Sequence, residues 1–373
     1  MNEDFLRKKS DERKQQNAYR QLRLPDAKID FNSNDYLGMV KNRLIPGQLL
    51  TSYKHGATGS RLLSGNYALI TGTEKMIADF HDADAGLIFN SGYDANIGLL
   101  SCVPQRGDTI IYDQLSHASI RDGIRLSFAQ SFSFLHNSPA DLEEKLRIAV
   151  GNIFVITETV FSMDGDMAPI PEIIKLCEKY KAFLIVDEAH ATGVIGARGE
   201  GLIQQLGLQK KCFARVHTFG KAVGCHGAIV LGSEELSNYL INFSRAFIYT
   251  TALPEISIAA IKTAYEIFPG LDTERNHLLR LIHNFQDEAS RRAALRVDIN
   301  VMKSFTPIQA VIVPGNDNVR KLSLQLAEVN LDIRPILYPT VPKGKERLRI
   351  VLHSFNSMEE VYRLMDTLFQ QKN

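Results

Sequence analysis

A chain of 373 residues is long enough for one large domain with a smaller one, or for two modest domains. Its 45% hydrophobic and 23% charged residues are typical of a soluble globular protein, and its net charge of +1 argues against general affinity for nucleic acid or anionic membranes. The four cysteines show neither C-x-x-C nor zinc spacing, which indicates reduced thiols in a cytosolic protein.

The first part of the chain is polar. Residues 1–24 predict a helix of mixed charge, and they lack the apolar stretch of a signal peptide. Because no run of about 18 apolar residues occurs, we expect no membrane insertion and a cytoplasmic location. Residues 28–38 predict a short strand and a turn, and the Gly- and Ser-rich residues 55–72 predict a loop.

Helical and strand patterns alternate from residue 73 onward. Residues 73–83 have a helical period, and residues 254–295 look like one long helix. Short apolar runs that end in polar or small residues predict strands at 85–92, 108–113, 152–162, 182–190 and 227–233. With helices such as 167–181 between them, these runs predict βαβ units and a sheet covered on both faces. Residues 296–373 predict a separate α/β lobe.

Polar residues that follow the predicted strands are candidate site residues, because open α/β sheets bind ligands outside the carboxyl ends of their strands. Asp187 ends a run that should be buried, and His190 follows it. His117 lies just beyond another run. The turn at 91–93 leads into a helix, whose first backbone N–H groups suit a phosphate.

Lys221 lies among small residues in "FGKAVG". Glycine and alanine let a bulky ligand approach the backbone, although a Gly-rich turn is more often only a turn. The histidines and the turn at 91–93 also have structural explanations, as satisfied polar groups and a helix cap. The acidic pair in "VDEAH" could bind a metal, but the chain has no G-x-x-x-x-G-K-[ST] motif, and we expect no metal.

These features together match the needs of pyridoxal 5′-phosphate (PLP). That cofactor requires a lysine for a Schiff base, a carboxylate for its pyridine nitrogen, a phosphate cradle and a flat group over its ring. Lys221, Asp187, the turn at 91–93 and His117 would meet these needs in turn.

The chain also resembles a known family over nearly its whole length. The segments "FNSNDYLG", "GSRLLSGN", "LSHAS", "VFSMDGD", "VDEAHATGVIG" and "TFGKAVG" resemble those of the α-oxoamine synthases, which are fold-type I PLP enzymes. The resemblance implies an α/β fold with a mostly parallel seven-stranded sheet in a large domain and a smaller C-terminal α/β domain. We expect an N-terminal segment at 1–45, a PLP-binding domain at 46–265 and a small domain at 266–373.

The resemblance further implies a role for each site residue. Lys221 would bond the cofactor, His117 would stack on its ring and Asp187 would pair with the pyridinium nitrogen, and these three would be catalytic. Further cofactor contacts would come from Ser91, Gly92, Tyr93, Ser162, His190 and Thr218 and, toward a partner's phosphate, from Thr250 and Thr251. Substrate contacts would come from Arg20, Asn34, His117, Thr340 and Arg349, where Arg349 would hold the amino-acid carboxylate.

The implied reaction is a decarboxylative condensation of an amino acid with an acyl thioester carried on coenzyme A or acyl carrier protein. Members that act in biotin synthesis join L-alanine to a pimeloyl thioester, which we expect here, and sister enzymes that use glycine or serine are the alternative. A binding or regulatory protein on the same scaffold is a further possibility, against which the joint presence of Lys221, Asp187, His117 and Arg349 argues. The resemblance implies a homodimer with active sites at its interface.

The chain departs from the family at a few positions. Ala222 replaces a glycine, and Asn356 in "HSFN" stands where the biotin-synthesis members usually have a histidine. The segments "DGIRLS" and "VPKGK" resemble a glycine-using sister. The alternating strand "RLRIVL" places Arg347 and Arg349 on one face, and we expect Arg347 to be solvated.

Overall fold

The computed structural model describes the whole chain except residues 1–2, 23, 25–26, 48–50, 297 and 371–373, so these parts of the predicted helix and domains lie outside the described residues. The chain packs as two compact units. Unit 1 comprises Met1–Asn34, Met163–Asp166 and Asn276–Asn373, and unit 2 comprises Asp35–Ser162 and Met167–Arg275. The three-segment division at 1–45, 46–265 and 266–373 stays a prediction.

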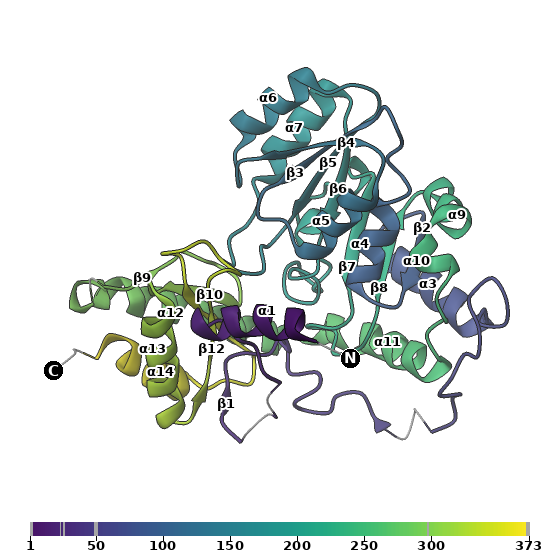
Figure 1. Cartoon of the computed structure of the whole chain (residues 1–373). Coiled ribbons are helices and arrows are strands. Elements are labelled where there is room, and N and C mark those ends of the chain that lie inside the picture. Colours follow the sequence, from purple (N-terminus) through teal and green to yellow (C-terminus); the bar gives the residue numbers. More distant parts are fainter. Residues whose placement is uncertain (1–2, 23, 25–26, 48–50, 297, 371–373) are drawn as a thin grey trace. The chain divides into compact units, whose positions relative to one another are not determined.

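Unit 2 is built on a seven-stranded sheet with the order β2-β8-β7-β6-β5-β3-β4 (Figure 1). Only β8 runs antiparallel to its neighbours, so the expected mostly parallel seven-stranded sheet is confirmed. The strands are β2 (Ala85–Phe89), β3 (Thr109–Asp113), β4 (Gln130–Phe134), β5 (Ile153–Glu158), β6 (Phe183–Asp187), β7 (Ala214–Thr218) and β8 (Ala228–Gly232).

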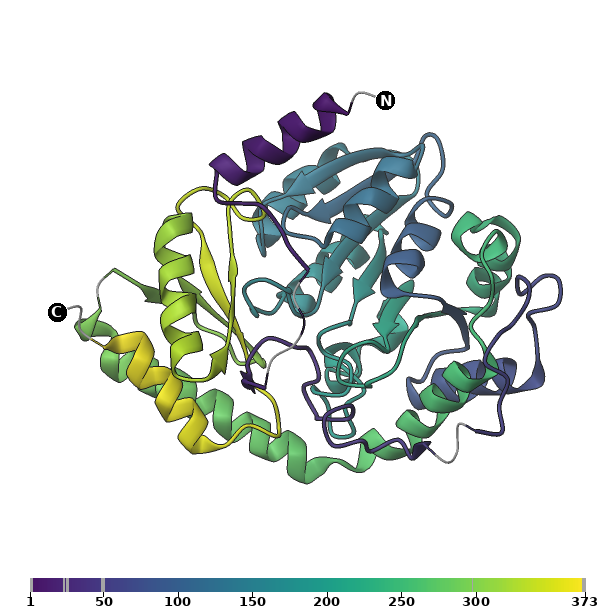
Figure 2. The same cartoon turned by 60° about the horizontal axis from the view of Figure 1, so that its bottom comes forward.

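Helices cover both faces of this sheet (Figure 2). They are α3 (Ala68–Phe80), α4 (Gly92–Leu100), α5 (Ala118–Leu126), α6 (Pro139–Ile148), α7 (Ile170–Tyr180), α8 (Leu202–Gln205), α9 (Glu234–Phe243), α10 (Arg245–Ile248) and α11 (Glu255–Ile267), with short 3-10 turns at η1 (Gln209–Lys211) and η2 (Phe268–Gly270). Alternate strand residues such as Ile110, Ile156 and Val216 form one core with α4, α5, α9 and α10. This alternation is expected where each face of a sheet is covered.

Two strands of the sheet were not predicted from the sequence. β4 lies at the sheet edge and is mostly exposed, so its polar residues give no apolar run. β7 is fully buried but contains three polar side chains, those of Arg215, His217 and Thr218. Arg215 Nη2 donates to the carbonyl oxygen of His81 at 2.6 Å, and the His217 ring pairs with Thr192 Oγ1 at 2.9 Å. These partners allow a strand without continuous apolar character to be buried.

Two helix predictions need correction. The loop expected at 55–72 ends early, because α3 begins at Ala68 and buries Ile70. The single helix expected at 254–295 is broken at Phe268–Gly270, where Pro269 lies between α11 and α12 (Asp272–Arg292). Proline lacks an N–H donor and clashes with the preceding turn, so the helical pattern cannot continue through it.

Unit 1 contains an antiparallel four-stranded sheet with the order β12-β13-β10-β9 and a separate parallel pair, β1-β11. Its strands are β1 (Ile29–Asp30), β9 (Asn300–Val301), β10 (Ile308–Ile312), β11 (Leu331–Asp332), β12 (Arg334–Ile336) and β13 (Arg347–Val351). Its helical segments are α1 (Asp4–Gln15), most of α12, η3 (Ala293–Leu295), α13 (Asn316–Glu328) and α14 (Met358–Phe369). The predicted N-terminal helix is therefore shorter than residues 1–24.

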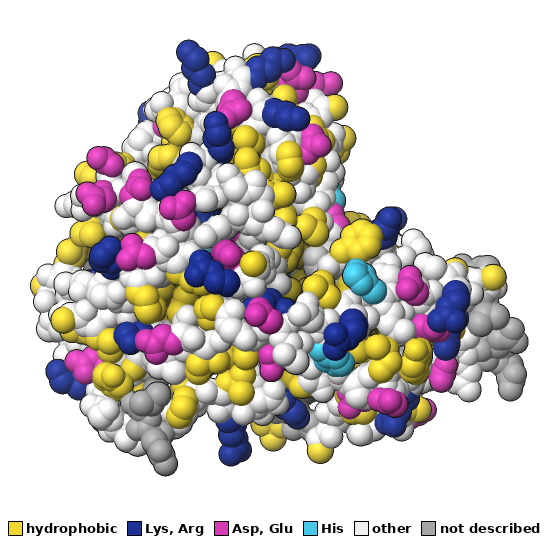
Figure 3. Space-filling model, turned by 180° about the vertical axis from the view of Figure 1, so that it is seen from behind, with side chains coloured by type: hydrophobic (Ala, Val, Ile, Leu, Met, Phe, Trp, Pro, Cys, Tyr) yellow, Lys and Arg dark blue, Asp and Glu magenta, His cyan; other side chains and the backbone are white. Residues whose placement is uncertain are grey.

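The surface mixes charges of both signs with apolar side chains on the face shown in Figure 3. Among the described helices, none has the length and apolar composition needed to cross a lipid bilayer. No group of three or more His, Cys, Asp or Glu side chains in the described part of the chain is arranged to hold a metal ion.

Candidate active site

The carboxyl ends of several strands of unit 2 meet at one edge of its sheet. Parallel pairing sets Glu158 at the end of β5 opposite Asp187 at the end of β6, and Asp187 opposite Val216, two residues before the end of β7. Thr218 ends β7, and the loop with Lys221 follows directly. Sequence reasoning therefore correctly expected these polar groups to gather at one edge.

Asp187 is a buried carboxylate that accepts hydrogen bonds from two neutral donors. It is 6% exposed. Its Oδ1 accepts the Ala189 N–H at 2.8 Å, and its Oδ2 accepts Asn96 Nδ2 at 2.8 Å. A carboxylate oxygen can accept more than one hydrogen bond, so Asp187 can still receive the N–H of a pyridinium.

The N-terminus of α4 and the end of β7 approach each other closely. A Cβ atom at Gly92 would lie 2.5 Å from Thr218 Cγ2, so only glycine allows this approach. The Thr218 hydroxyl is buried and has no hydrogen-bond partner among the described residues. An unsatisfied buried hydroxyl beside a helix N-terminus fits a phosphate, because the helix presents free N–H groups and a partial positive charge there.

Ser91 and Tyr93 are already engaged next to this helix N-terminus. Ser91 is the N-cap of α4, where its Oγ accepts the Asp94 N–H at 3.0 Å and donates to Asp94 Oδ2 at 2.8 Å. The Tyr93 hydroxyl donates to Asp122, and this bond raises the pKa of Tyr93. Their predicted contacts with the cofactor stay predictions, as does that of the half-buried Ser162.

The loop after β7 holds Lys221 in a tight turn. The Lys221 carbonyl oxygen accepts the Gly224 N–H at 2.8 Å, and the Phe219 carbonyl accepts the Cys225 N–H at 2.7 Å. Ala222 is buried, and a Cβ atom at Gly193 would lie 2.7 Å from the Ala222 methyl group. The departure at Ala222 is therefore accommodated by a glycine in the neighbouring loop, and Lys221 keeps its small surroundings.

His117 is the N-cap of α5 and has well-defined partners. Its backbone N–H donates to Glu158 Oε1 at 2.6 Å, and its Nδ1 lies 2.8 Å from Ser119 Oγ. Desolvation lowers the pKa of His117 below 6.5, the Asp187 carboxylate opposes this shift, and Lys221 adds to it. A neutral imidazole suits stacking on an aromatic ring, since it carries no charge to be desolvated.

His190 is fixed by a tyrosine that sequence reasoning did not single out. His190 is 5% exposed, and its Nδ1 lies 2.6 Å from the hydroxyl of Tyr36. Tyr36 is fully buried. Its hydroxyl holds the ring of His190, as second partners commonly orient a histidine whose other nitrogen serves a ligand.

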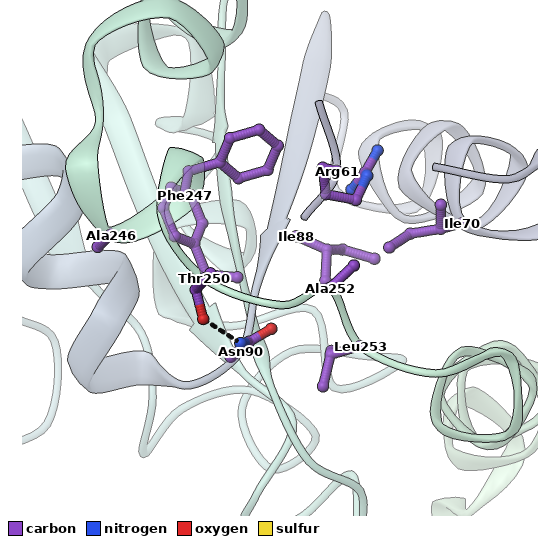
Figure 4. Close-up of a pocket in the computed structure, with 10 residues that line it drawn as sticks. Arg61, Ile70, Ile88, Asn90, Ala246, Phe247, Thr250, Ala252 and Leu253 are labelled. Atoms are coloured by element: carbon purple, nitrogen blue, oxygen red, sulfur yellow. Dashed lines mark hydrogen bonds between the residues drawn. The ribbon is translucent and has the colours of Figure 1, made fainter. Parts of the chain in front are cut away.

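Thr250 and Thr251 accept hydrogen bonds from Asn90, the residue that directly follows β2. Asn90 Nδ2 donates to Thr250 Oγ1 at 2.9 Å (Figure 4). It also donates to the Thr251 carbonyl oxygen at 2.8 Å. The cavity drawn in Figure 4 has a volume of about 10 Å³, which suits roughly one water molecule and not a cofactor. The expected reach of both threonines to a partner's phosphate stays a prediction.

In unit 1, the predicted substrate residues are brought together in pairs. Arg349 on β13 is half-buried, and its Nη2 donates to Asn34 Oδ1 at 2.9 Å. Arg20 Nη2 donates to Thr340 Oγ1 at 3.0 Å on the surface. The substrate contacts expected of these four residues stay predictions.

The expectation for Arg347 was wrong. It is 6% exposed and forms an ion pair with Asp164, and its Nε donates to the Lys345 carbonyl oxygen at 3.0 Å. Breaking a buried pair leaves one charge uncompensated. Arg347 therefore serves the packing of unit 1, and the strand alternation that predicted its face could not predict Asp164.

The departure at Asn356 also has a structural explanation. Asn356 is 2% exposed, and its Oδ1 accepts the backbone N–H of His353 at 2.9 Å and faces His353 Nδ1 at 3.0 Å. Its Nδ2 donates to the Asp30 carbonyl oxygen and to Glu360 Oε2, both at 3.2 Å. The amide thus links β1, the segment that follows β13, and α14 within unit 1.

Sequence reasoning missed Asn96 and Tyr36, and it assigned no role to Glu158. Asn96 lies one helical turn after the turn at 91–93, and Tyr36 lies within the segment "FNSNDYLG" that resembles the α-oxoamine synthases. Both contact a predicted site residue that is distant in the sequence. Helical spacing from Gly92 was the one signal that could have indicated Asn96.

Glu158 gives the site a pH-dependent stability. Burial, and then the Asp187 carboxylate, raises the pKa of Glu158 from 4.5 to about 8. The folded protein therefore keeps a proton that the unfolded chain loses, so the contribution of Glu158 to stability is greatest below pH 4.5 and falls until about pH 8. Glu158→Gln should remove this decline, because glutamine does not ionise.

The measurement is the unfolding midpoint of the cofactor-free protein from pH 5 to pH 9. Glu158→Gln should lose less stability than wild type over this range, by an amount of order a few kcal/mol. Glu143→Gln, at a partly exposed acid on α6, is the control and should follow wild type. Equal slopes for wild type and Glu158→Gln would contradict the raised pKa.

Comparison with known proteins agrees with this geometry. Residues 26–368 match the family model for aminotransferase class I and II. The chain is 40% identical to the 8-amino-7-oxononanoate synthase of Emericella nidulans, over 92% of this chain and 89% of that protein. The solved 8-amino-7-oxononanoate synthase of Francisella tularensis has 29% identity and a TM-score of 0.80, covering 93% of this chain and 98% of that one. A solved structure of serine palmitoyltransferase (SPT) with PLP has 26% identity and a TM-score of 0.85, covering 91% of this chain and 86% of that one.

The architecture and the sequence agree on the family. The mostly parallel sheet, the acid that ends β6 and the lysine loop after β7 occur in a chain whose match to the family model extends over nearly its full length. The chain belongs to the aminotransferase class I and II family.

Proposed function

We propose that this chain catalyses the PLP-dependent condensation of L-alanine with a pimeloyl thioester, which gives 8-amino-7-oxononanoate, CO₂ and a free thiol for biotin synthesis. The gathering of Asp187, the Lys221 loop and the N-terminus of α4 at one sheet edge carries the proposal. The substrates are those implied by the relatives named 8-amino-7-oxononanoate synthase.

The residues of unit 2 fit the cofactor. PLP, when bound, supplies an electron sink for the negative charge that develops at Cα of the amino acid. The carboxylate of Asp187 would hold the proton on the pyridine nitrogen, and the ring of His117 would lie against the cofactor ring. The Thr218 hydroxyl and the first N–H groups of α4 would bind the phosphate. The remaining expected contacts are Ser91, Tyr93, Ser162 and His190 and, from a partner subunit, Thr250 and Thr251.

Lys221 would bond the cofactor and act as the base. After L-alanine displaces it, its Nζ would take the Cα proton, and the new C–C bond would form as the C–S bond of the thioester breaks. The thiol would leave with the proton that Lys221 took from Cα. The former alanine carboxylate would leave as CO₂, and a proton from solvent, delivered by Lys221, would replace it at Cα. Lys221 is suited to this work because a free amine at its Nζ exchanges protons readily.

Residues of unit 1 would bind the substrates. Arg349 would hold the carboxylate of L-alanine through its planar fork, and Asn34 would orient the arginine. The surface pair Arg20 and Thr340 would contact the acyl chain. We also propose a homodimer with active sites at the subunit interface and a cytoplasmic location.

A matrix of substrates tests the proposal. The purified protein with PLP is offered L-alanine, glycine or L-serine with pimeloyl, acetyl or palmitoyl thioesters of coenzyme A and of acyl carrier protein, and thiol release is measured. We expect the highest kcat/KM for L-alanine with a pimeloyl thioester. A higher value for glycine with acetyl-CoA, or for L-serine with palmitoyl-CoA, would favour a sister enzyme. Release with no pair would indicate a protein without this catalysis.

A further inference from the structure

Asn96 on α4 links two of the site residues. It is 3% exposed, and its Nδ2 donates to Asp187 Oδ2 at 2.8 Å and to Ser119 Oγ at 3.0 Å. An ionised carboxylate only accepts hydrogen bonds, so the amide nitrogen must face Asp187. Both amide hydrogens are then committed, one to the carboxylate and one to the serine.

The direction of the next hydrogen bond follows from this. Because Ser119 Oγ accepts from Asn96, its own hydrogen is free to be donated to His117 Nδ1, 2.8 Å away. The backbone N–H of Ser119 also donates to His117 Nδ1, at 3.2 Å. Two donors directed at one ring nitrogen make it the acceptor, so neutral His117 carries its proton on Nε2.

We propose that Asn96 and Ser119 are positioning residues that couple Asp187 to His117 through one directed chain of hydrogen bonds. The chain keeps Asp187 as an acceptor for the cofactor nitrogen and fixes the tautomer and ring plane of His117. The inference rests on the proposed use of PLP, but it concerns residues to which neither the resemblance nor the reaction assigns a role.

Several features favour coupling over simple packing. Asn96 and Ser119 are buried at 3% and 1% exposure, respectively. Buried polar groups cost stability unless they form hydrogen bonds. Here the amide nitrogen of Asn96 and the hydroxyl of Ser119 form theirs within this series of four residues. Hydrogen bonds in a connected buried chain polarise one another, so a change at Asp187 is felt at His117. Desolvation lowers the pKa of His117, which favours the neutral ring whose Nδ1 can accept these hydrogen bonds.

The test is a set of variants read through the bound cofactor. The cofactor-free protein is titrated with PLP, and protein fluorescence measures the binding affinity. The absorbance of the bound cofactor is then recorded against pH, and the pH at which its change is half complete is the pH midpoint. Asn96→Leu removes both amide hydrogens at similar size, and Ser119→Ala removes only the hydroxyl. We expect PLP binding to weaken about tenfold or more for Asn96→Leu and by a smaller factor for Ser119→Ala, with a shifted pH midpoint in both.

A second background makes the test specific. His117→Phe keeps a flat ring but removes the acceptor nitrogen. Because Ser119 acts through His117, Ser119→Ala should have no further effect on PLP affinity or pH midpoint in His117→Phe. Asn96→Leu should still weaken binding there, since it also loses its bond to Asp187. Such unequal coupling is what a double-mutant cycle measures.

The outcomes separate this inference from the proposed function. The coupling would be overturned if Ser119→Ala had equal effects in both backgrounds. It would also be overturned if Asn96→Leu lowered the melting temperature but left the PLP affinity and the pH midpoint unchanged. If Asn96→Leu does not fold, the Ser119 cycle decides alone. Failure of the wild-type protein to bind PLP would instead overturn the proposed function itself, and the coupling with it.

Discussion

Asp187→Asn is expected to keep the fold and to lose nearly all turnover. The change removes the negative charge that would hold the proton on the pyridine nitrogen, and without that proton the cofactor is a weaker electron sink. A preorganised electrostatic contact of this kind contributes several kcal/mol, so kcat should fall about 100-fold or more. Thiol release with L-alanine and the pimeloyl thioester measures the loss.

Asp108→Asn is the matched control for this variant. Asp108 directly precedes β3, so it lies at the amino end of that strand, whereas the candidate site lies at the carboxyl ends. It is 7% exposed and accepts the backbone N–H groups of Gln105 and Asn152 at 2.8 and 2.9 Å. Its substitution removes a buried charge of the same kind, so it should affect stability and leave turnover of the folded protein nearly unchanged. Turnover of Asp187→Asn within about threefold of wild type would contradict the ion pair with the cofactor.

Arg349→Ala is expected to weaken binding of L-alanine by about 30-fold or more. Removing one partner of a buried, hydrogen-bonded charge pair costs roughly 2–5 kcal/mol, and 2 kcal/mol corresponds to about 30-fold. The measurement is a titration of the cofactor absorbance with L-alanine, L-serine and glycine. Arg349→Lys should retain part of the affinity, since lysine keeps the charge but not the fork.

Arg347→Ala separates a substrate contact from a packing role on the same strand. Because Arg347 is buried against Asp164, its loss should lower the melting temperature and leave the affinity of the folded protein for L-alanine nearly unchanged. If Arg347→Ala abolished binding and Arg349→Ala did not, the register of the proposed contact would be wrong by two residues. If neither variant changed the affinity, the carboxylate would not be held by β13.

The sequence predicted those parts of the fold that local patterns determine. The apolar runs of β3, β5 and β6 end at Asp113, Glu158 and Asp187, so both the strands and the acids at their ends could be recognised. β7 could not, because Arg215 and His217 interrupt its apolar character and find their partners in His81 and Thr192, which lie on other segments. Burial of polar residues depends on tertiary partners, which a local pattern does not contain.

The same reason limited the prediction of the site. Lys221, Asp187 and His117 were identified because each lies in a distinctive local segment. The link between Asp187 and Asn96 joins residues 91 positions apart, and its second bond depends on how α4 packs on α5. The burial of Arg347 depends likewise on Asp164. Long-range contacts of this kind follow from the packing of helices and strands and not from residue spacing.

Borohydride reduction of the PLP-loaded protein, followed by peptide mapping, tests the central claim most directly. Reduction makes the bond between the cofactor and its lysine permanent, so the labelled residue can be identified by mass. The account predicts a pyridoxyl label on Lys221, in the loop between β7 and β8, and none in Lys221→Arg. A label on another lysine, such as the exposed Lys54, or an equal label in Lys221→Arg would contradict it.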